Sequence, residues 1–361
     1  MARNGMPGGV ATTDNDRTNT AVEWSERMSD LERSRAACGA GARYFLGCLV
    51  LMTSALACAE DTASRQSMDD AWWTGPLLAA SASSLPRGHF LVEPYLYDII
   101  SYAHYDTGGR RVSTPHENDF GSQSYVLYGI TDRITAGLIP RFGFVEASQG
   151  PGSTGVGVGD LTLQGQYRLT RFQEGSWVPT TSIVLGETLP TGKYDRLGEH
   201  PADGFGSGAY TTTVSLYSQD YIWLANGRIL RTRLDLSYAF AHQVSLEGVS
   251  VYGTGTGFTG HANPGDTLTI DSSWEYSITR KWVLALDIVY EHDANTRVLG
   301  SYPGSLPIQQ SSGASQYFGY APAIEYNWSP RFGVIVGARY IPSGHNINAT
   351  VTPVAAINMV F

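Results

Sequence analysis

The amino-acid sequence predicts a transmembrane antiparallel up-and-down β-barrel of about twelve strands. From residue 88 onward, apolar and polar residues alternate with a period of two, which is typical of β-strands with two different faces. The connections between these runs are short and long in turn, as in barrels of the bacterial outer membrane. Beyond residue 57 no apolar run approaches the roughly 18 residues of a membrane-spanning helix, so any membrane span must be a β-strand.

The composition fits a surface that meets both lipid and water. Only 16% of the 361 residues are charged, well below the roughly 25% of an ordinary soluble domain. The 21 tyrosines outnumber the 12 phenylalanines, and tyrosine suits a boundary between an apolar and a wet region. The net charge of −9 and the lack of a basic stripe exclude nucleic-acid binding, because phosphate neutralisation needs a basic face.

The N-terminal residues have the features of a secretory signal peptide. Residues 44–57 form an apolar run of signal-peptide length, arginines precede it, and Ala-Cys-Ala at 57–59 supplies a small-x-small cleavage site. The residues before Met28 are polar and without pattern, so we expect Met28 to be the true initiator. Lipidation at Cys58 is the alternative, although Ala55 stands where a lipoprotein signal usually has leucine.

The cysteines support this division of the chain. All three lie in the leader, at Cys38, Cys48 and Cys58. Removal of the leader leaves no thiol, which suits an oxidising periplasm and excludes a cysteine nucleophile or a thiolate metal site. The expected organisation is a leader with signal peptide over residues 1–59, a periplasmic N-terminal segment over 60–87 and an outer-membrane β-barrel over 88–361.

The alternation is clearest in residues 228–242. Leu234 and Leu236 share one face of this run, while Arg233 and Asp235 share the other. Twelve such runs predict strands at 89–104, 122–131, 133–146, 160–171, 177–189, 209–224, 228–242, 266–279, 281–292, 315–328, 331–342 and 349–361.

The connections alternate in length along the chain. Short turns are expected at 131–133, 172–176, 226–227, 279–281 and 329–331. Long Gly-, Pro- and Asn-rich loops are expected at 105–121, 147–159, 190–208, 243–265, 293–314 and 343–348. Short periplasmic turns and long extracellular loops are the signature of outer-membrane barrels, and this arrangement puts both ends of the barrel on the periplasmic rim.

Polar residues of both signs occupy the second face of the strands. A soluble β-sandwich, the main alternative, also alternates, but it exposes its polar face to bulk water. Mixed charges fit a narrow wet lumen in which opposite charges pair across the bore. The predicted lumen-lining residues are Arg141, Arg168, Arg231, Arg233, Asp235, Asp271, Glu275, Asp287, Glu291, Glu325 and Arg339.

Aromatic residues and the C-terminus agree with a barrel. Aromatic side chains gather at strand ends, as in the interfacial girdles of membrane barrels. The chain ends in alternating Ile357, Met359 and Phe361, the type of tail that the barrel-assembly machinery reads. We therefore expect these three residues to form an assembly signal, and outer-membrane lipid and lipopolysaccharide to surround the barrel.

Three segments carry a family resemblance. GVGVGDLTLQGQYRL (155–169), LGETLPTGKYD (185–195) and PLLAASASSLPRGHFLVEPYLY (76–97) resemble elements of an outer-membrane β-barrel family linked to meta-cleavage phenol degradation, the MetA-pathway-of-phenol-degradation family, whose members are often labelled transporters. The resemblance covers residues 76–361. It implies a barrel that admits small hydrophobic or aromatic compounds, and it supplies no catalytic residues.

The sequence contains no catalytic constellation. The nucleophile-elbow motif G-x-S-x-G does not occur, and the eight histidines are scattered singly. His116-Glu117 and Glu291-His292-Asp293 place metal-type ligands at the loop rim, where solvated polarity explains them more simply than calcium or a lipopolysaccharide-bridging cation. We expect no enzymatic activity, no cofactor and no protein metal site.

Three functional hypotheses remain. The first is a porin-like transport protein of the Gram-negative outer membrane, which admits small aromatic or hydrophobic solutes by diffusion through the lumen. Loop 243–265 is its best candidate for a gate, because Tyr252 and Phe258 are the only large apolar side chains in a small, flexible segment; loop 190–208 is the second. The alternatives are a structural or adhesive barrel whose loops bind a partner or lipopolysaccharide, and a membrane-embedded hydrolase.

Overall fold

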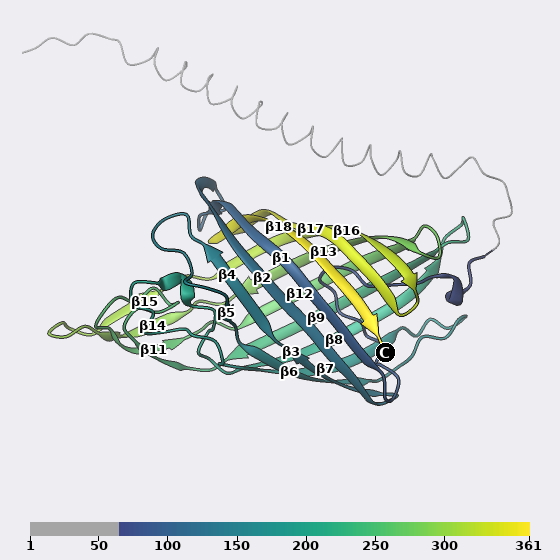
Figure 1. Ribbon diagram of the computed structural model, residues 1–361, viewed down its shortest axis with the longest axis horizontal. Helices are drawn as coiled ribbons and strands as arrows, with labels where there is room; N and C mark the ends of the chain where they lie inside the picture. The colour runs from purple at the N-terminus through teal and green to yellow at the C-terminus, as the bar shows by residue number, and fades with distance from the viewer. Residues whose placement is uncertain (1–64) are drawn as a thin grey trace, which may run out of the picture. The chain divides into compact units, whose positions relative to one another are not determined.

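A computed structural model describes residues 65–361. The leader expected over 1–59, with its alternative start at Met28, lies outside the described residues. Twelve antiparallel strands form a closed barrel, because β1 (Phe90–Tyr105) pairs both with β2 (Arg111–Thr131) and with β18 (Ile347–Val360). Figure 1 shows these strands side by side, with β18 in yellow. The twelve-strand barrel is thus confirmed.

The rest of the wall follows chain order. Its strands are β3 (Ile134–Ile139) with β4 (Arg141–Glu146), β6 (Leu161–Arg168), β7 (Thr180–Leu189), β8 (Thr211–Trp223), β9 (Ile229–Ala241), β12 (Thr267–Ser277), β13 (Trp282–Asp293), β16 (Ser315–Ser329) and β17 (Phe332–His345). Both β3 and β4 pair with β2 and together form one row, which is interrupted at Pro140. Proline has no N–H to donate to the ladder, so the strand breaks there.

The strands share an apolar outer face. The inner face is polar on β9, whereas Ala321 of β16, Ile335 of β17 and Ala356 of β18 pack with Leu77 inside the barrel. In β9 the side chains of Leu234 and Leu236 are exposed on the outside, whereas Arg233 and Asp235 are buried inside. Lipid offers no hydrogen-bond partners to the backbone. In a closed barrel the backbone N–H groups of each strand bond to the neighbouring strands.

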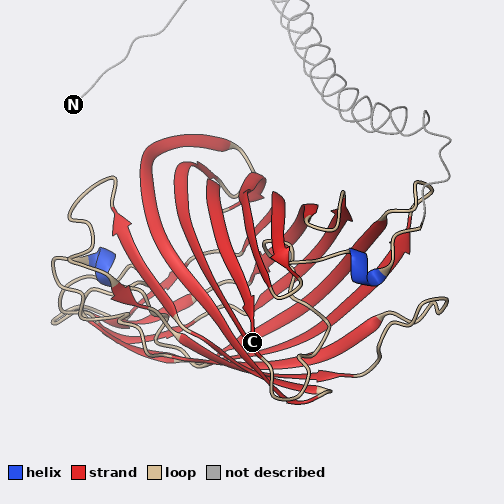
Figure 2. Cartoon of the chain, turned by 45° about the vertical axis from the view of Figure 1, so that its right-hand side comes forward, coloured by secondary structure: helices blue, strands red, loops and turns tan. Residues whose placement is uncertain are grey.

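The described helices, drawn blue in Figure 2, are two 3-10 turns, η1 (Met68–Asp70) and η2 (Pro201–Asp203). No helix within residues 65–361 is long and apolar enough to cross a membrane.

Two of the expected long loops are short turns. The loop expected over 105–121 has only five residues, because β1 ends at Tyr105 and β2 begins at Arg111. The loop expected over 343–348 is a single residue, Asn346, between β17 and β18. The outer half of β2 is exposed on nearly all its residues and therefore lacks the apolar alternation that marks a membrane strand. Asn346 has a φ of +54°, a left-handed conformation that asparagine tolerates and that makes the turn tight.

Two further expected loops form a second sheet. β10 (Val244–Glu247), β11 (Thr259–Asn263), β14 (Arg297–Ser301) and β15 (Ile308–Ser311), which we name the outer sheet, pair in that order. The outer sheet extends the wall at the loop end of the barrel (Figure 1). Its core contains Phe258, whose side chain is 1% exposed, packed with Val244 and Val298. The expectation that 243–265 and 293–314 are loops throughout is therefore wrong.

The two ends of the barrel wall meet at the short-turn rim. The N–H of Phe361 donates to the carbonyl of Phe90 (2.8 Å), and the N–H of Phe90 donates to the carbonyl of Phe361 (3.2 Å). The C-terminal residue therefore forms the last pair of the closing strands. Its role as an assembly signal stays a prediction.

Candidate functional site

Residues 74–85, which we name the N-terminal strap, cross the inside of the barrel. The N–H of Leu77 donates to Asp287 on β13 (3.0 Å), and the N–H of Leu85 donates to Thr135 Oγ1 on β3 (2.9 Å). In the strand order of the closed wall, five strands separate β13 from β3 in either direction. The strap therefore joins opposite sides of the lumen.

Buried wall carboxylates hold the strap. Backbone N–H groups of the strap donate to three of them at 2.6–3.2 Å: Asp287 accepts from Leu77 and Ala79, Glu325 from Thr74 and Gly75, and Asp235 from Ala80. An extended segment without a neighbouring strand needs such partners, because an unpaired buried N–H is costly. Residues 60–87 were expected to be a periplasmic N-terminal segment. Residues 74–85 of this segment bond to the wall, which supplies the acceptors of the strap.

The two wall arginines nearest the strap share one carboxylate. Arg231 Nε donates to Glu275 at 2.5 Å, and Arg233 Nε donates to the same carboxylate at 3.1 Å. Arg231 lies directly opposite Glu275 in the pairing of β9 with β12. The charges therefore pair between neighbouring strands along the wall, and not across the bore as expected. Directly opposed side chains on adjacent strands are only about 5 Å apart at Cβ, whereas the bore is wider.

The remaining predicted lumen residues lie at inward positions of their strands but do not form one site. Asp271 is buried on β12, and Glu291 and Arg168 are half-buried on β13 and β6. Arg141 and Arg339 lie elsewhere, beside a cavity on the other side of the lumen. The structure thus separates a strap-holding cluster on β9, β12, β13 and β16 from a pair of arginines on β4 and β17.

A cavity of about 280 Å³, which we name the lumen cavity, lies against the strap. Tyr95, Tyr97 and Tyr125 line it from β1 and β2, and Leu77 and Leu78 line it from the strap. The rings of Tyr95 and Tyr125 meet edge to face, with centroids 5.8 Å apart. Aromatic faces and leucines suit an apolar ring. The sequence analysis missed these tyrosines, although their alternate spacing along each strand already placed them on one face.

Two of the three family-like segments, 155–169 and 185–195, meet in space. The Asp160 carboxylate accepts hydrogen bonds from the N–H of Gly192 (2.9 Å) and from the N–H and hydroxyl of Ser207 (2.7 Å each). Thr191 Oγ1 donates to the carbonyl of Gly159 (3.0 Å). The glycine run before β6 and the Pro-Thr-Gly segment after β7 therefore anchor both ends of loop 190–208. Asp160 was not among the predicted site residues.

Loop 190–208, the second gate candidate, packs on the inner face of the wall. The ring of Phe205 lies so close to Gly143 that a Cβ there would be 2.6 Å from it, and a Cβ at Gly157 would overlap it. The neighbours of Gly143 in β4, Phe142 and Phe144, are exposed on the outer face. Gly143 therefore faces inward, and Phe205 narrows the lumen at this point.

The first gate candidate, loop 243–265, contributes β10 and β11 to the outer sheet. Phe258 belongs to the core of the outer sheet, so its side chain is fixed. The hydroxyl of Tyr252 donates to the carbonyl of Ser207 (2.6 Å), and burial raises the pKa of this phenol to about 12. Tyr252 therefore supports loop 190–208 as a neutral donor.

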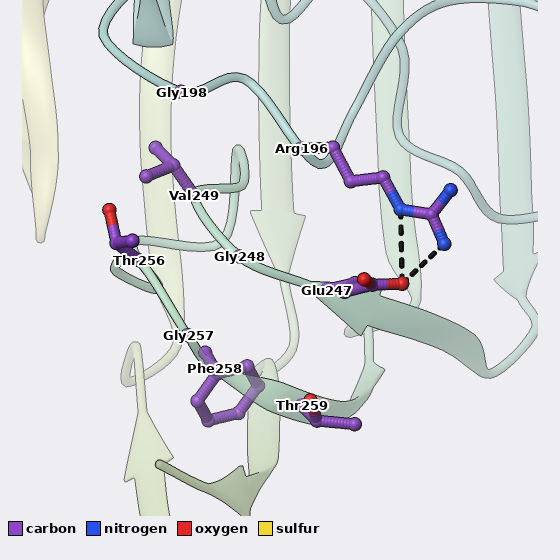
Figure 3. Close-up of a pocket in the computed structure, with 9 residues that line it drawn as sticks. All are labelled: Arg196, Gly198, Glu247, Gly248, Val249, Thr256, Gly257, Phe258 and Thr259. Carbon is purple, nitrogen blue, oxygen red and sulfur yellow. Dashed lines mark hydrogen bonds and ion pairs between the residues drawn. The ribbon is translucent and has the colours of Figure 1, made fainter. Parts of the chain in front are cut away.

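A shallow pocket of about 260 Å³ lies among the outer loops. Figure 3 shows Arg196 reaching Glu247 beside Gly248 and Phe258. The ion pair is exposed to solvent, so the pocket lacks a buried polar group that could select a ligand. Within residues 65–361 no group of three or more His, Cys, Asp or Glu side chains could hold a metal ion.

The rim motifs and the histidines form no hydrolytic arrangement in the described chain. His116 and Glu117 are on the outer extension of β2, and Asp293 accepts hydrogen bonds from the hydroxyls of Thr267 and Ser315. In residues 65–361 no histidine ring is hydrogen-bonded to a serine hydroxyl or to a carboxylate.

One solved outer-membrane channel shares the fold of this chain. The COG4313 outer membrane channel from Pseudomonas putida F1 matches with a TM-score of 0.61 and 15% identity, over 78% of this chain and 98% of that one. The translocator domain of the autotransporter NalP from Neisseria meningitidis (TM-score 0.42, 11% identity, 77% and 90%) and the Ralstonia pickettii toluene transporter TbuX (0.36, 11%, 82% and 97%) are more distant. No curated protein matches the sequence.

The closed barrel, its apolar outer face and the fold shared with the Pseudomonas channel place the protein in a bacterial outer membrane. A family model matches residues 102–352, which confirms the resemblance seen in the sequence motifs. The chain belongs to the family described as "Putative MetA-pathway of phenol degradation".

Proposed function

We propose that the protein is an outer-membrane channel for passive uptake of small aromatic or hydrophobic compounds. The observation that carries the proposal is the lumen cavity, in which Tyr95, Tyr97 and Tyr125 face two leucines of the strap. Such a surface holds an aromatic ring by dispersion and edge-to-face contacts. Membership of a family named for phenol degradation and the shared fold of the Pseudomonas channel support this proposal.

The strap gives this channel a closed state. It joins β13 to β3 across the bore and carries Leu77 and Leu78, which line the cavity. A solute that enters from the loop side passes Phe205, reaches the cavity and must then pass the strap. The strap is held by hydrogen bonds from its backbone N–H groups to wall side chains, so local release of a few of them opens the path without unfolding the wall. No covalent step and no cofactor is required.

Two measurements test the proposal. The protein is expressed in the outer membrane of a porin-deficient Gram-negative strain, and the uptake of radiolabelled phenol is compared with that of a sugar of similar size. The purified barrel is also studied in planar bilayers, where phenol should change the single-channel conductance. A barrel that is electrically silent, and cells that take up phenol no faster than cells without it, would contradict the channel function.

The outer sheet favours a second candidate, an adhesive or structural barrel. This sheet has its own core around Phe258, and it carries exposed apolar side chains such as Leu306 (84% exposed) at a loop tip. A rigid, partly apolar surface beyond the membrane could bind a partner or lipopolysaccharide. Deletion of residues 243–265 decides between the two: loss of surface binding with unchanged uptake supports adhesion, whereas altered uptake supports the channel.

A further inference from the structure

We propose that the lumen cavity selects aromatic acids, and that Arg141 and Arg339 bind the carboxylate of a single-ring compound whose ring packs on the tyrosines. This inference rests on the proposed channel function and names the substrate class. The two arginines come from β4 and β17, which are separated by β2, β1 and β18 in the wall, and both line the same 280 Å³ space.

Neither guanidinium forms an ion pair within the described residues. Among residues 65–361 the ion pairs with N···O distances up to 4.0 Å involve other arginines, and neither Arg141 nor Arg339 takes part. By contrast, Arg231 and Arg233 at the strap are both paired with Glu275. One pair of lumen arginines thus shares a carboxylate partner, whereas the other pair is available to an anion.

The polar groups of the cavity agree with an anion and not with a cation. Its lining contains two arginines and no Asp or Glu, although the whole chain has a net charge of −9. Arg339 Nε and Thr352 Oγ1 are both buried without a hydrogen-bond partner in the described structure, and Thr352 is only 4% exposed. Thr352 lies directly opposite Arg339 in the pairing of β17 with β18. Two unpaired donors therefore sit side by side at the cavity, where a carboxylate can accept from both.

The apolar side of the cavity fits one aromatic ring. Tyr97 lies flat over Gly121, where a Cβ would overlap its ring, and Tyr125 is fixed by a hydrogen bond from Gln123 Nε2 to its hydroxyl (2.6 Å). Gln123 is itself opposite Arg141 in the pairing of β2 with β4. The aromatic wall and the guanidinium are thus placed on adjacent strands. A volume of 280 Å³ is just below the roughly 300–1,000 Å³ of pockets for drug-sized ligands, so it suits a single ring.

The test uses the barrel purified from outer membranes and equilibrium binding of radiolabelled benzoate. Binding to the wild type is compared with binding to Arg141→Gln and Arg339→Gln, and Arg168→Gln is the matched control, because Arg168 is a lumen-side arginine outside the cavity. Acetate and phenol serve as competitors that carry only the anion or only the ring. Benzoate should bind at least tenfold more tightly than either, and each cavity variant should weaken it about tenfold, the effect of one charge-assisted hydrogen bond.

Several outcomes overturn the inference. Equal affinities for benzoate and phenol would show that the guanidinium groups do not contribute to binding. Equal losses of benzoate affinity in all three variants would show that the overall electrostatic potential of the lumen, and not the two cavity arginines, attracts the anion. Arg141→Lys keeps the positive charge, so it should retain much of the affinity that Arg141→Gln loses. Binding is measured without transport, so failed uptake of every aromatic compound would refute the channel while leaving this site intact.

Discussion

Asp287 in the wall accepts a hydrogen bond from the backbone of Leu77 in the strap (3.0 Å), although 210 residues separate them along the chain. The same carboxylate also accepts from Ala79 (3.2 Å). One side chain of β13 thus fixes the part of the strap that lines the lumen cavity. In the proposed channel, closure of the lumen and the shape of the lumen cavity therefore depend on the same contact.

Replacing this carboxylate should release the strap. Asp287→Ala leaves the N–H groups of Leu77 and Ala79 without acceptors, which costs about 1–3 kcal/mol for each buried donor. We expect hydrogen exchange at these two amides to accelerate at least tenfold and the conductance of the barrel to rise. Asp69→Asn is the control, because Asp69 is exposed near the strap and holds none of its N–H groups. Unchanged exchange in the Asp287 variant would show that the strap is held elsewhere.

The loop that carries Phe205 should depend on Asp160. This buried carboxylate joins Gly192 to Ser207, so Asp160→Ala removes the acceptor that holds both ends of loop 190–208. We expect limited proteolysis to cleave this loop in the variant while the barrel strands stay intact. Glu199→Gln, an exposed change in the same loop, should leave cleavage at the wild-type rate. Equal protection of both variants would mean that the other contacts of the loop, such as those of Phe205 and Tyr252, are sufficient to hold it.

Charge should be tolerated on one face of β9 and not on the other. Leu236 is 37% exposed on the outer, lipid-facing side, so Leu236→Arg should cost about 2–4 kcal/mol of unfolding free energy near the bilayer midplane. Ser237 faces the lumen and donates to Ser215 Oγ (2.8 Å), so Ser237→Arg should be tolerated. Urea unfolding in lipid vesicles measures both variants. Similar losses at the two positions would contradict the assigned faces.

The C-terminal residue should matter for assembly more than for stability. Only backbone atoms of Phe361 bond to Phe90, so Phe361→Ala keeps both closing hydrogen bonds. If Ile357, Met359 and Phe361 are an assembly signal, the variant should accumulate in the periplasm during synthesis, yet refold in detergent with nearly the wild-type unfolding midpoint. Fractionation of cells measures the first property and denaturant titration the second. Normal membrane levels of the variant would refute the signal.

The strands of the wall could be predicted because neighbouring residues in each strand lie in two different environments, and their polarity alternates accordingly. A residue such as Leu236 lies on the outer, lipid-facing side and its neighbour Asp235 lies inside the barrel, so alternation along a dozen residues is sufficient to define a strand and its inner face. The family motifs could be recognised for a similar reason, since each is a short local segment. The outer sheet and the outer half of β2 were missed because both lie beyond the lipid, where this alternation is not required.

The composition of the site was decided by the tertiary structure alone. The strap residues 74–85 are a mixture of leucines and small residues, and nothing in their order indicates that their backbone bonds to Asp235, Asp287 and Glu325 on three different strands. Among the arginines, the sequence could not separate those paired with Glu275 from Arg141 and Arg339, which share a cavity. The alternation of apolar and polar residues determines which face of a strand a side chain occupies. The contacts between side chains of different strands depend on barrel closure and on the path of the strap. Closure and the strap both bring together residues that are far apart in the chain.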